Sequence, residues 1–430
     1  MRAARKVLII GGGGREHAIA WALARSPRSP EIWCAPGNPG IAQVATCVPI
    51  AITDVDALAA FVEQEGIDLT IVGPEAALLA GVADEFRRRG LQIVGPTRDG
   101  AMLEGSKTYA KRVMQRAGVP TAAHRSFSSL SDARAHVRDA ALPLVIKADG
   151  LAAGKGVVIA YKLAEAEAAV ESMLRDGAFG EAGSRVVIEE FMHGSEATVM
   201  ALVSDGVVRA LAPSRDHKRA HDGDEGPNTG GMGAYSPVAE ISAADLEVIE
   251  RTILQPVVDL LAADGIDYRG VLYAGLMLGP DGPRVVEFNA RFGDPETQAV
   301  LPRLTSDLLT VLEAVARGTL GEIDLEWSNQ AATCIVVAAD NYPEQPRTGM
   351  AITLPAAVPE SMIFHAGTAR ATNGDLLVAG GRVLGVTALG PDVPHATRTA
   401  YETTNAITFD GAWWRTDIAG SATAKLVTIN

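Results

Sequence analysis

The sequence has little cysteine. Its three cysteines, Cys34, Cys47 and Cys334, are odd in number and stand outside any C-x-x-C pattern. A disulfide framework or a zinc site would need a regular cysteine spacing, so neither is expected. Thiols without such a spacing suit a reducing compartment, and we expect a cytoplasmic protein.

Positive charge and long hydrophobic runs are also scarce. The 38 Lys and Arg residues against 52 Asp and Glu residues leave a net charge of -14. General nucleic-acid binding needs many basic side chains, so a phosphate ligand here must meet positive charge that is concentrated locally. Four glycines at 11–14 interrupt the first apolar run, and no later run is long enough to span a membrane. We expect a monomer without nucleic-acid or membrane partners.

What is present indicates several domains of α/β and α+β type. A chain of 430 residues suggests about three domains. Within the first hundred residues, apolar runs alternate with helical patterns, which predicts a parallel sheet of βαβ units. From about 120 to 191 the pattern predicts a small α+β module with a helix over 163–174. Next come a helix over about 243–263 and the strand pair VLYAGLML and RVVEFNARF, and the chain is rich in strands from about 331.

The segment GGGGREHA follows the first predicted strand and opens a helix, so its N–H groups and helix dipole could hold a phosphate. As a dinucleotide fingerprint it is defective. Glu16 stands where the third glycine belongs, and Ala35 and Pro36 stand where a ribose-binding acid is expected. NAD is therefore disfavoured, while a smaller phosphorylated ligand and a plain tight turn both stay open.

Two further loops, APGNPG and GPEAAL, follow strands at the edge of a parallel sheet where ligands collect. Asn38 and Glu75 in these loops are suited to hydrogen-bond a sugar. The alternative is that the prolines and glycines simply form turns.

The segment KADGLAAGKGV joins a strand lysine, Lys147, to a glycine-rich loop that contains Lys155. Such a loop can fold over phosphates. It is not a P-loop, because Gly150 and Gly154 are too close and Gly156 replaces the Ser or Thr. A lysine in a buried strand needs an anionic partner, for which an ATP phosphate is the natural candidate. A solvent loop is the alternative.

The segment RVVEFNARFGDPE is the most informative. A strand period of two places Glu287 and Asn289 on one face, with Val286 and Phe288 in the core. Magnesium takes one or two protein carboxylates and completes its shell with water and phosphates. Arg291, two residues further on, reaches the same side if the strand continues, and its planar fork suits a phosphoryl oxygen. The alternative is a half-exposed strand with a surface salt bridge.

Taken in order, these segments resemble the ATP-grasp superfamily and, within it, the phosphoribosylamine–glycine ligase family, over nearly the whole chain. The segments are GGGGREHA, APGNPG, VGPEAAL, LEGSKTYAK, VIKADGLAAGKGVVIA, VIEEFMHGSEAT, DHKR, PNTGGMGAYSP, YAGLM, VEFNARFGDPETQ, FHAGT, GGRVL and VTALG. The resemblance implies a Rossmann-like N-terminal domain over 1–104, an ATP-grasp main lobe over 105–123 and 192–328, a small lobe or lid over 124–191, and a β-rich C-terminal domain over 329–430.

The resemblance also implies roles for single residues. Nucleotide binding falls to Lys107, Lys147, Gly150, Gly154, Lys155 and Gly156, to the backbone of the linker Glu189, Glu190 and Phe191 for adenine, and to Glu196 for the ribose. Magnesium or manganese falls to Glu287 and Asn289. Phosphoribosylamine falls to Gly13, Asn38, Pro74 and Glu75, and catalysis at the glycine and γ-phosphate falls to Asp216, Lys218 and Arg291.

The implied reaction joins glycine to 5-phosphoribosylamine through glycyl phosphate, with ATP as co-substrate. The alternatives are another ATP-grasp carboxylate–amine ligase or a ribonucleotide carboxylase, a nicotinamide oxidoreductase, and a noncatalytic ATP sensor. The chain departs from the family pattern at Arg215, where Gln is common, after Pro237, and in its tail after Ile418. The strand YAGLML offers no acidic ligand for a second metal ion.

Overall fold

The computed structural model describes residues 4–150, 156–175, 184–356 and 358–420. Its N-terminal part is a parallel sheet in the order β3-β2-β1-β4-β5, as predicted. The strands are β1 (Lys6–Gly11), β2 (Glu31–Pro36), β3 (Thr46–Cys47), β4 (Leu69–Val72) and β5 (Ile93–Val94). The helices of this part are α1 (Gly14–Ala24), α2 (Val55–Glu65), α3 (Glu75–Leu79), α4 (Val82–Arg88) and α5 (Arg98–Gly105), with the short turn η1 (Ile41–Gln43). Because α1 and α3 begin just after β1 and β4, Gly13 and Glu75 lie at the same sheet edge.

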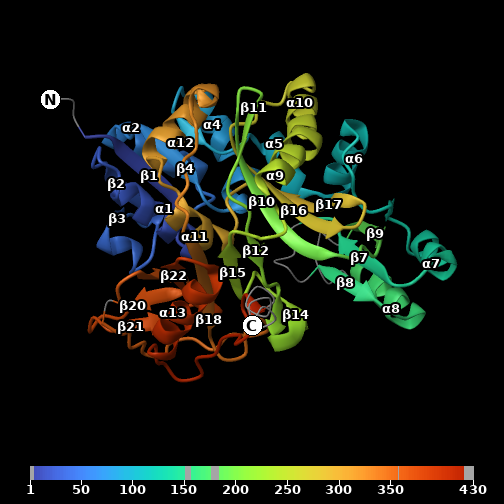
Figure 1. Cartoon of the computed structure of the whole chain (residues 1–430). Helices are drawn as coiled ribbons and strands as arrows, with labels where there is room; N and C mark the ends of the chain where they lie inside the picture. The colour runs from blue at the N-terminus through green and yellow to red at the C-terminus, as the bar shows by residue number, and fades with distance from the viewer. Residues whose placement is uncertain (1–3, 151–155, 176–183, 357, 421–430) are drawn as a thin grey trace.

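A small module projects from the body of the molecule (Figure 1). It contains an antiparallel sheet in the order β6-β9-β7-β8, made of β6 (His124–Phe127), β9 (Val186–Glu190), β7 (Leu144–Ala148) and β8 (Val157–Ala160). The helices α7 (Leu130–Asp139) and α8 (Leu163–Leu174) pack against each other and enclose an apolar core with the sheet. The predicted helix over 163–174 is confirmed.

The main lobe is built on a second antiparallel sheet in the order β11-β10-β16-β17. Its strands are β11 (Val207–Ala210), β10 (Ser195–Ser204), β16 (Gly270–Gly279) and β17 (Gly282–Asn289). The surrounding helices are α6 (Lys107–Ala117), α9 (Ala243–Ile249), the π-helical η4 (Glu250–Leu254), α10 (Gln255–Ala263), α11 (Glu296–Val300), η5 (Leu301–Arg303), α12 (Leu308–Arg317) and η6 (Leu320–Glu322). This sheet supplies Glu196, Glu287 and Asn289.

A β-bulge interrupts the pairing of β16 with β17. Gly275 pairs with Glu287, but the next residue, Leu276, pairs with Val285. Val286 is therefore the extra residue and is half-buried, whereas Val285 and Phe288 lie in the core. The prediction that Val286 enters the core was wrong, because strict alternation does not hold across a bulge.

A third sheet joins the C-terminal part to the main lobe, in the order β12-β15-β18-β22-β19. Its strands are β12 (Arg215–Asp216), β15 (Gly233–Ser236), β18 (Ala331–Ala338), β22 (Arg382–Gly390) and β19 (Ser361–His365), covered by α13 (Val393–Asn405). Two hairpins accompany it, β13 (Arg219–His221) with β14 (Glu225–Asn228) and η3 (Asp222–Asp224), and β20 (Thr368–Arg370) with β21 (Leu376–Val378). The expected boundary at 328 thus divides a continuous sheet, so strands from both sides of it hold the loop around Asp216 and Lys218.

In the described part of the chain, no helix is both long and apolar enough to cross a membrane.

Candidate functional site

Two lysines share one carboxylate where the small module meets the main lobe. The Nζ atoms of Lys111 and Lys147 each lie 3.1 Å from Glu189 Oε2, and all three residues are buried. Lys147 also donates to the carbonyl oxygen of Val286 at the bulge, over 3.1 Å. Lys147 thus has an anionic partner, Glu189, within the chain itself, and its contact with a nucleotide phosphate stays a prediction. The trio still keeps one excess positive charge for a phosphate.

Lys107 connects the first turn of α6 to the glycine-rich loop. Its Nζ donates to the carbonyl oxygen of Gly150 over 3.1 Å. Burial lowers the pKa of Lys107, against the opposing attraction of Glu287. Gly156, at the other end of the loop, is buried and accepts a hydrogen bond from Ala148 N. Gly154 and Lys155 lie outside the described residues.

Glu287 and Asn289 lie on one face of β17, and both are half-buried. Burial acts to raise the pKa of Glu287, but the nearby Lys218, Lys147 and Lys107 outweigh it, so the pKa is lowered. Glu287 is therefore an ionised carboxylate near the lysines. A carboxylate must be ionised to bind a metal ion. The same face is the one on which the sequence predicts a magnesium site.

Lys218 joins the loop after β12 to this carboxylate. Its Nζ lies 2.9 Å from Glu196 Oε2 and 3.9 Å from Glu287 Oε1. Next to it, burial raises the pKa of Asp216 to about 7, opposed by Lys218 and reinforced by Glu296. The structure thus brings Glu196, Glu287 and Asp216 together around the ammonium group of Lys218.

Arg291 connects the main lobe to the N-terminal sheet. Its Nη2 lies 2.7 Å from Glu104 Oε1, and its Nε lies 3.3 Å from Glu75 Oε2. Burial acts to raise the pKa of Glu75, but Arg291 and Arg15 outweigh it and the pKa is lowered. Pro74 directly precedes this contact as the N-cap of α3. The predicted substrate loop at Glu75 therefore touches the predicted catalytic arginine.

The glycine-rich turn before α1 makes room for a carboxylate of the chain itself. Gly13 N donates to Glu16 Oε2 over 2.6 Å. A Cβ atom at Gly73 would lie 1.9 Å from Glu16 Oε1, and one at Gly11 would lie 2.6 Å from the same side chain. Asp294 Oδ2 also lies 3.7 Å from the position of a Cβ atom at Gly13. With two carboxylates so close, the expected phosphate site at the turn itself is disfavoured.

The side chain of Asn38 is fully used within the chain. Its Nδ2 donates to the carbonyl oxygens of Gly12 and His365, and its Oδ1 accepts from Gly40 N and Ile41 N, all over 2.8–2.9 Å. A side-chain amide has two donor hydrogens and two acceptor lone pairs, so none remains for a sugar. The predicted contact of this side chain with substrate is therefore contradicted, and Asn38 instead ties the first loop to β19.

The linker expected to hydrogen-bond adenine begins later than predicted. Glu189 lies inside β9, paired with His124 of β6 and Val145 of β7. The N–H of Glu190 donates to Ala123 O, and its carboxylate binds Arg284 and Ala123 N. The backbone is thus outside the strand only from Phe191 onward, where the ring lies 6.2 Å from that of Tyr161. The backbone role predicted for Glu189 was wrong, because the strand continues through it.

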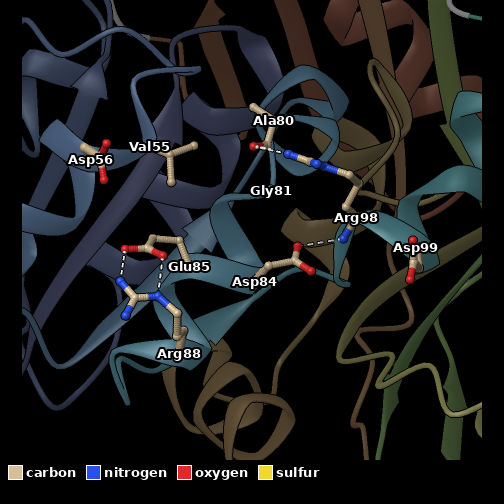
Figure 2. Close-up of a pocket in the computed structure, with 9 residues that line it drawn as sticks. All are labelled: Val55, Asp56, Ala80, Gly81, Asp84, Glu85, Arg88, Arg98 and Asp99. Atoms are coloured by element: carbon tan, nitrogen blue, oxygen red, sulfur yellow. Dashed lines mark hydrogen bonds and ion pairs between the residues drawn. The ribbon is translucent and has the colours of Figure 1, made fainter.

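A hollow of about 480 Å³ lies away from these residues, between α2, α4 and α5 (Figure 2). Arg88 pairs with Glu85, the backbone N–H of Arg98 donates to Asp84, and the guanidinium of Arg98 donates to the carbonyl oxygens of Leu79 and Ala80. The predicted site residues that the structure describes do not line it. The hollow by itself therefore indicates no binding or catalytic function.

Several buried polar residues of the site escaped the sequence analysis. Lys111 follows Lys107 by four positions, so the two lie on the same face of α6, which was a usable signal. Glu296 lies 2.7 Å from Tyr273 Oη, close to Asp216, and Glu104 pairs with Arg291. No local pattern distinguishes Glu104 or Glu296, because their partners are distant in sequence.

Comparison with known families agrees with this arrangement. Three models of phosphoribosylglycinamide synthetase match in succession, the N domain over residues 5–104, the ATP-grasp (A) domain over 105–297 and the C domain over 332–421. The chain belongs to the phosphoribosylglycinamide synthetase family. It is therefore an ATP-grasp ligase that uses ATP.

Relatives in this synthetase family match along the full length. The phosphoribosylamine–glycine ligase of Ralstonia nicotianae is 49% identical over 97% of this chain and 99% of its own, and that of Halalkalibacterium halodurans is 48% identical over 97% of each. The crystal structure of the enzyme from Thermotoga maritima has a TM-score of 0.85 at 34% identity, covering 96% of this chain and 100% of its own. A biotin carboxylase domain from Hydrogenobacter thermophilus, at 14% identity and a TM-score of 0.73 over 95% of this chain and 91% of its own, shares the fold.

Proposed function

We propose that this chain joins glycine to 5-phosphoribosylamine, forming glycinamide ribonucleotide with release of ADP and phosphate. The observation that supports this best is the contact of Arg291 with Glu75, because it joins the substrate edge of the N-terminal sheet to the face with Glu287. Full-length relatives that are named phosphoribosylamine–glycine ligase support the same choice of substrates.

In this proposal the nucleotide lies between the sheet β6-β9-β7-β8 of the small module, here called the lid sheet, and the sheet β11-β10-β16-β17 of the main lobe. Lys107 and Lys147 offset the phosphate charge, and Glu196 with Lys218 borders the ribose end. Glu189 Oε1 supports an adenine nearby, because it is buried and accepts no hydrogen bond from a described residue. Such an acceptor is costly unless a ligand donates to it. Phe191 begins the linker beside it.

Magnesium, or manganese, suits Glu287 and Asn289. Within the described ranges, no group of three or more His, Cys, Asp and Glu side chains is arranged around a metal position. One carboxylate and one amide are nevertheless the small oxygen set that magnesium uses when phosphates and water complete its shell. When bound, the ion would neutralise phosphate charge. The absence of an acid on β16 leaves these two residues as its ligands from this strand pair.

The chemistry proceeds in two steps. The glycine carboxylate attacks the γ-phosphorus of ATP, the bond to the ADP oxygen breaks, and glycyl phosphate forms. The amine of 5-phosphoribosylamine then attacks the acyl carbon, loses a proton, and displaces inorganic phosphate. Lys218 and Arg291 stabilise the charge that spreads over the phosphoryl oxygens, since such transfers depend mainly on positioning and electrostatics. Asp216, beside Lys218, orients the glycine in this proposal.

A phosphate-release assay with each substrate omitted in turn tests this function. 5-Phosphoribosylamine is formed in the assay from ribose 5-phosphate and ammonia. We expect full phosphate release only with ATP, glycine and the amine together. Equal release without glycine, or with bicarbonate or formate in its place, would favour a carboxylase or another ligase of the same superfamily.

A further inference from the structure

Arg382 lies where three parts of the chain meet. It is the first residue of β22, and its Nη1 donates to the carbonyl oxygens of Gly230, Gly231 and Asp294 over 2.6, 3.3 and 2.9 Å. Its Nε and Nη2 donate to no residue in the described ranges, and the side chain is 22% exposed. A Cβ atom at Gly230 would lie 3.2 Å from Nε and 3.0 Å from Nη2, so the glycine at this position keeps that side of the guanidinium open. One side of the guanidinium fork is therefore anchored while the other is available to a ligand.

Three other cations of the candidate site are more fully engaged. Arg291 uses all three nitrogens on Glu75, Glu104 and Phe292 O. Arg15 lies 2.6 Å from Glu16 and donates to Phe292 O. Lys218 pairs with Glu196. Among these four cations, Arg382 therefore keeps the largest share of donors that no described residue accepts.

Asp294 places Arg382 beside the glycine-rich turn. One oxygen of this carboxylate, Oδ1, lies 3.4 Å from Arg382 Nη1. The other, Oδ2, lies 3.7 Å from the position of a Cβ atom at Gly13. A single carboxylate thus spans the distance between the guanidinium and the turn. Because Glu16 and Asp294 disfavour a phosphate at Gly13 itself, a phosphorylated ligand bound beside the turn needs this guanidinium.

We infer that Arg382 binds the 5-phosphate of 5-phosphoribosylamine through Nε and Nη2. The inference rests on the proposed function and adds a residue of the C-terminal sheet to the amine substrate's site. The two nitrogens form the edge of a planar fork that can donate to two oxygens of one phosphate. Gly230 and Gly231 hold the guanidinium through their carbonyl oxygens.

The test compares two amines that differ only in the phosphate. 5-Phosphoribosylamine and unphosphorylated ribosylamine are formed from ammonia with ribose 5-phosphate or ribose, and kcat/KM is measured for each. We expect Arg382→Gln to reduce the preference for the phosphorylated amine by about 10- to 100-fold, the loss of a charged hydrogen-bonded pair. The KM for ATP and kcat/KM for ribosylamine should change little. Arg382→Lys should keep part of the preference.

Arg370→Gln is the matched control, since Arg370 lies on β20 of the same part of the chain and its Nη1 donates only to Gly374 O among described residues. It should keep the wild-type preference. An equal loss with both amines in Arg382→Gln would mean that Arg382 only supports the loop at Gly230, and would overturn the inference. A wild-type chain that makes no product from the phosphorylated amine would instead refute the proposed function.

A second measurement avoids substitution. Wild-type protein is treated with an arginine-specific dicarbonyl reagent, and the modification of Arg382 is followed by mass spectrometry. Ribose 5-phosphate should slow the modification, whereas ribose should not. No protection by ribose 5-phosphate at saturating concentration would overturn the inference even if Arg382→Gln fails to fold.

Discussion

The ammonium group of Lys147 lies 3.1 Å from Glu189 Oε2, and both residues belong to the lid sheet. Lys111 approaches the same oxygen from α6 of the main lobe, while Lys147 donates to Val286 O on β17. The three charges therefore connect the two lobes on the side where the nucleotide is proposed to bind. Two expectations on stability follow from their arrangement, and two on catalysis follow from Glu287 on β17 and from Arg291 just after it.

Glu189→Gln should destabilise the ligand-free protein by about 3 kcal/mol, because two buried ammonium groups lose their shared counter-charge. Saturating magnesium-ATP should reduce the difference in stability between wild type and Glu189→Gln, since its phosphates supply negative charge. Thermal unfolding with and without the nucleotide measures both effects. Glu190→Gln is the control, because this neighbouring side chain is exposed and should cost less than about 1 kcal/mol. A deficit that ATP leaves unchanged would count against a nucleotide beside Glu189.

Lys111 should make stability rise with pH in an alkaline window. Burial lowers the pKa of Lys111 from 10.5 to about 8, although Glu189 opposes the shift. Between these two values the unfolded chain binds more protons than the folded one, so stability increases with pH, by about 3 kcal/mol in total. Urea unfolding at pH 8, 9 and 10 should show that the free energy of unfolding of the wild type increases relative to that of Lys111→Met as the pH rises. A constant difference across this window would contradict the shift.

Glu287→Gln should lower kcat by about 100-fold or more, since the cleft loses the carboxylate that supports the divalent ion and its phosphates. The magnesium concentration for half-maximal rate should rise as well. Asn289→Asp is the matched variant, because it keeps an oxygen ligand on the same face and should retain much more activity. Wild-type turnover by Glu287→Gln at saturating magnesium would remove this residue from the metal site.

Arg291→Ala should lower kcat by about 100-fold while changing the KM for ATP much less, because the guanidinium acts on charge that develops during transfer. The substitution also leaves Glu104 buried without its partner, so thermal stability must be measured alongside. Arg291→Lys keeps the positive charge but loses the planar guanidinium, and its kcat should lie between those of wild type and Arg291→Ala. Unchanged kcat in a folded Arg291→Ala protein would exclude the role.

The sequence predicts the layered organisation well because short-range patterns determine it. The parallel sheet, the helix of α8 and the β16–β17 pair all follow from hydrophobic period and turn residues. The bulge at Val286 and the sheet that crosses residue 328 were missed, because they depend on pairing between distant strands.

The site residues likewise fall into those that local sequence patterns predict and those that depend on distant contacts. Glu287 and Lys147 are recognisable because each is a polar residue in an otherwise apolar strand. Asn38 was misjudged, since its four hydrogen bonds join loops that are up to 327 residues apart. The glycines before α1 suggested a phosphate, but the fold uses them to accommodate Glu16. A motif therefore indicates a close approach without indicating which group approaches.

Transfer of an oxygen isotope tests the acyl-phosphate route most directly. Glycine labelled with ¹⁸O in both carboxylate oxygens is turned over with ATP and 5-phosphoribosylamine, and the inorganic phosphate is analysed by mass spectrometry. We expect one ¹⁸O atom in each phosphate released, because the attacking carboxylate oxygen leaves with the phosphorus. Unlabelled phosphate, with the carboxylate oxygen lost on amide formation released as labelled water instead, would contradict the acyl-phosphate route.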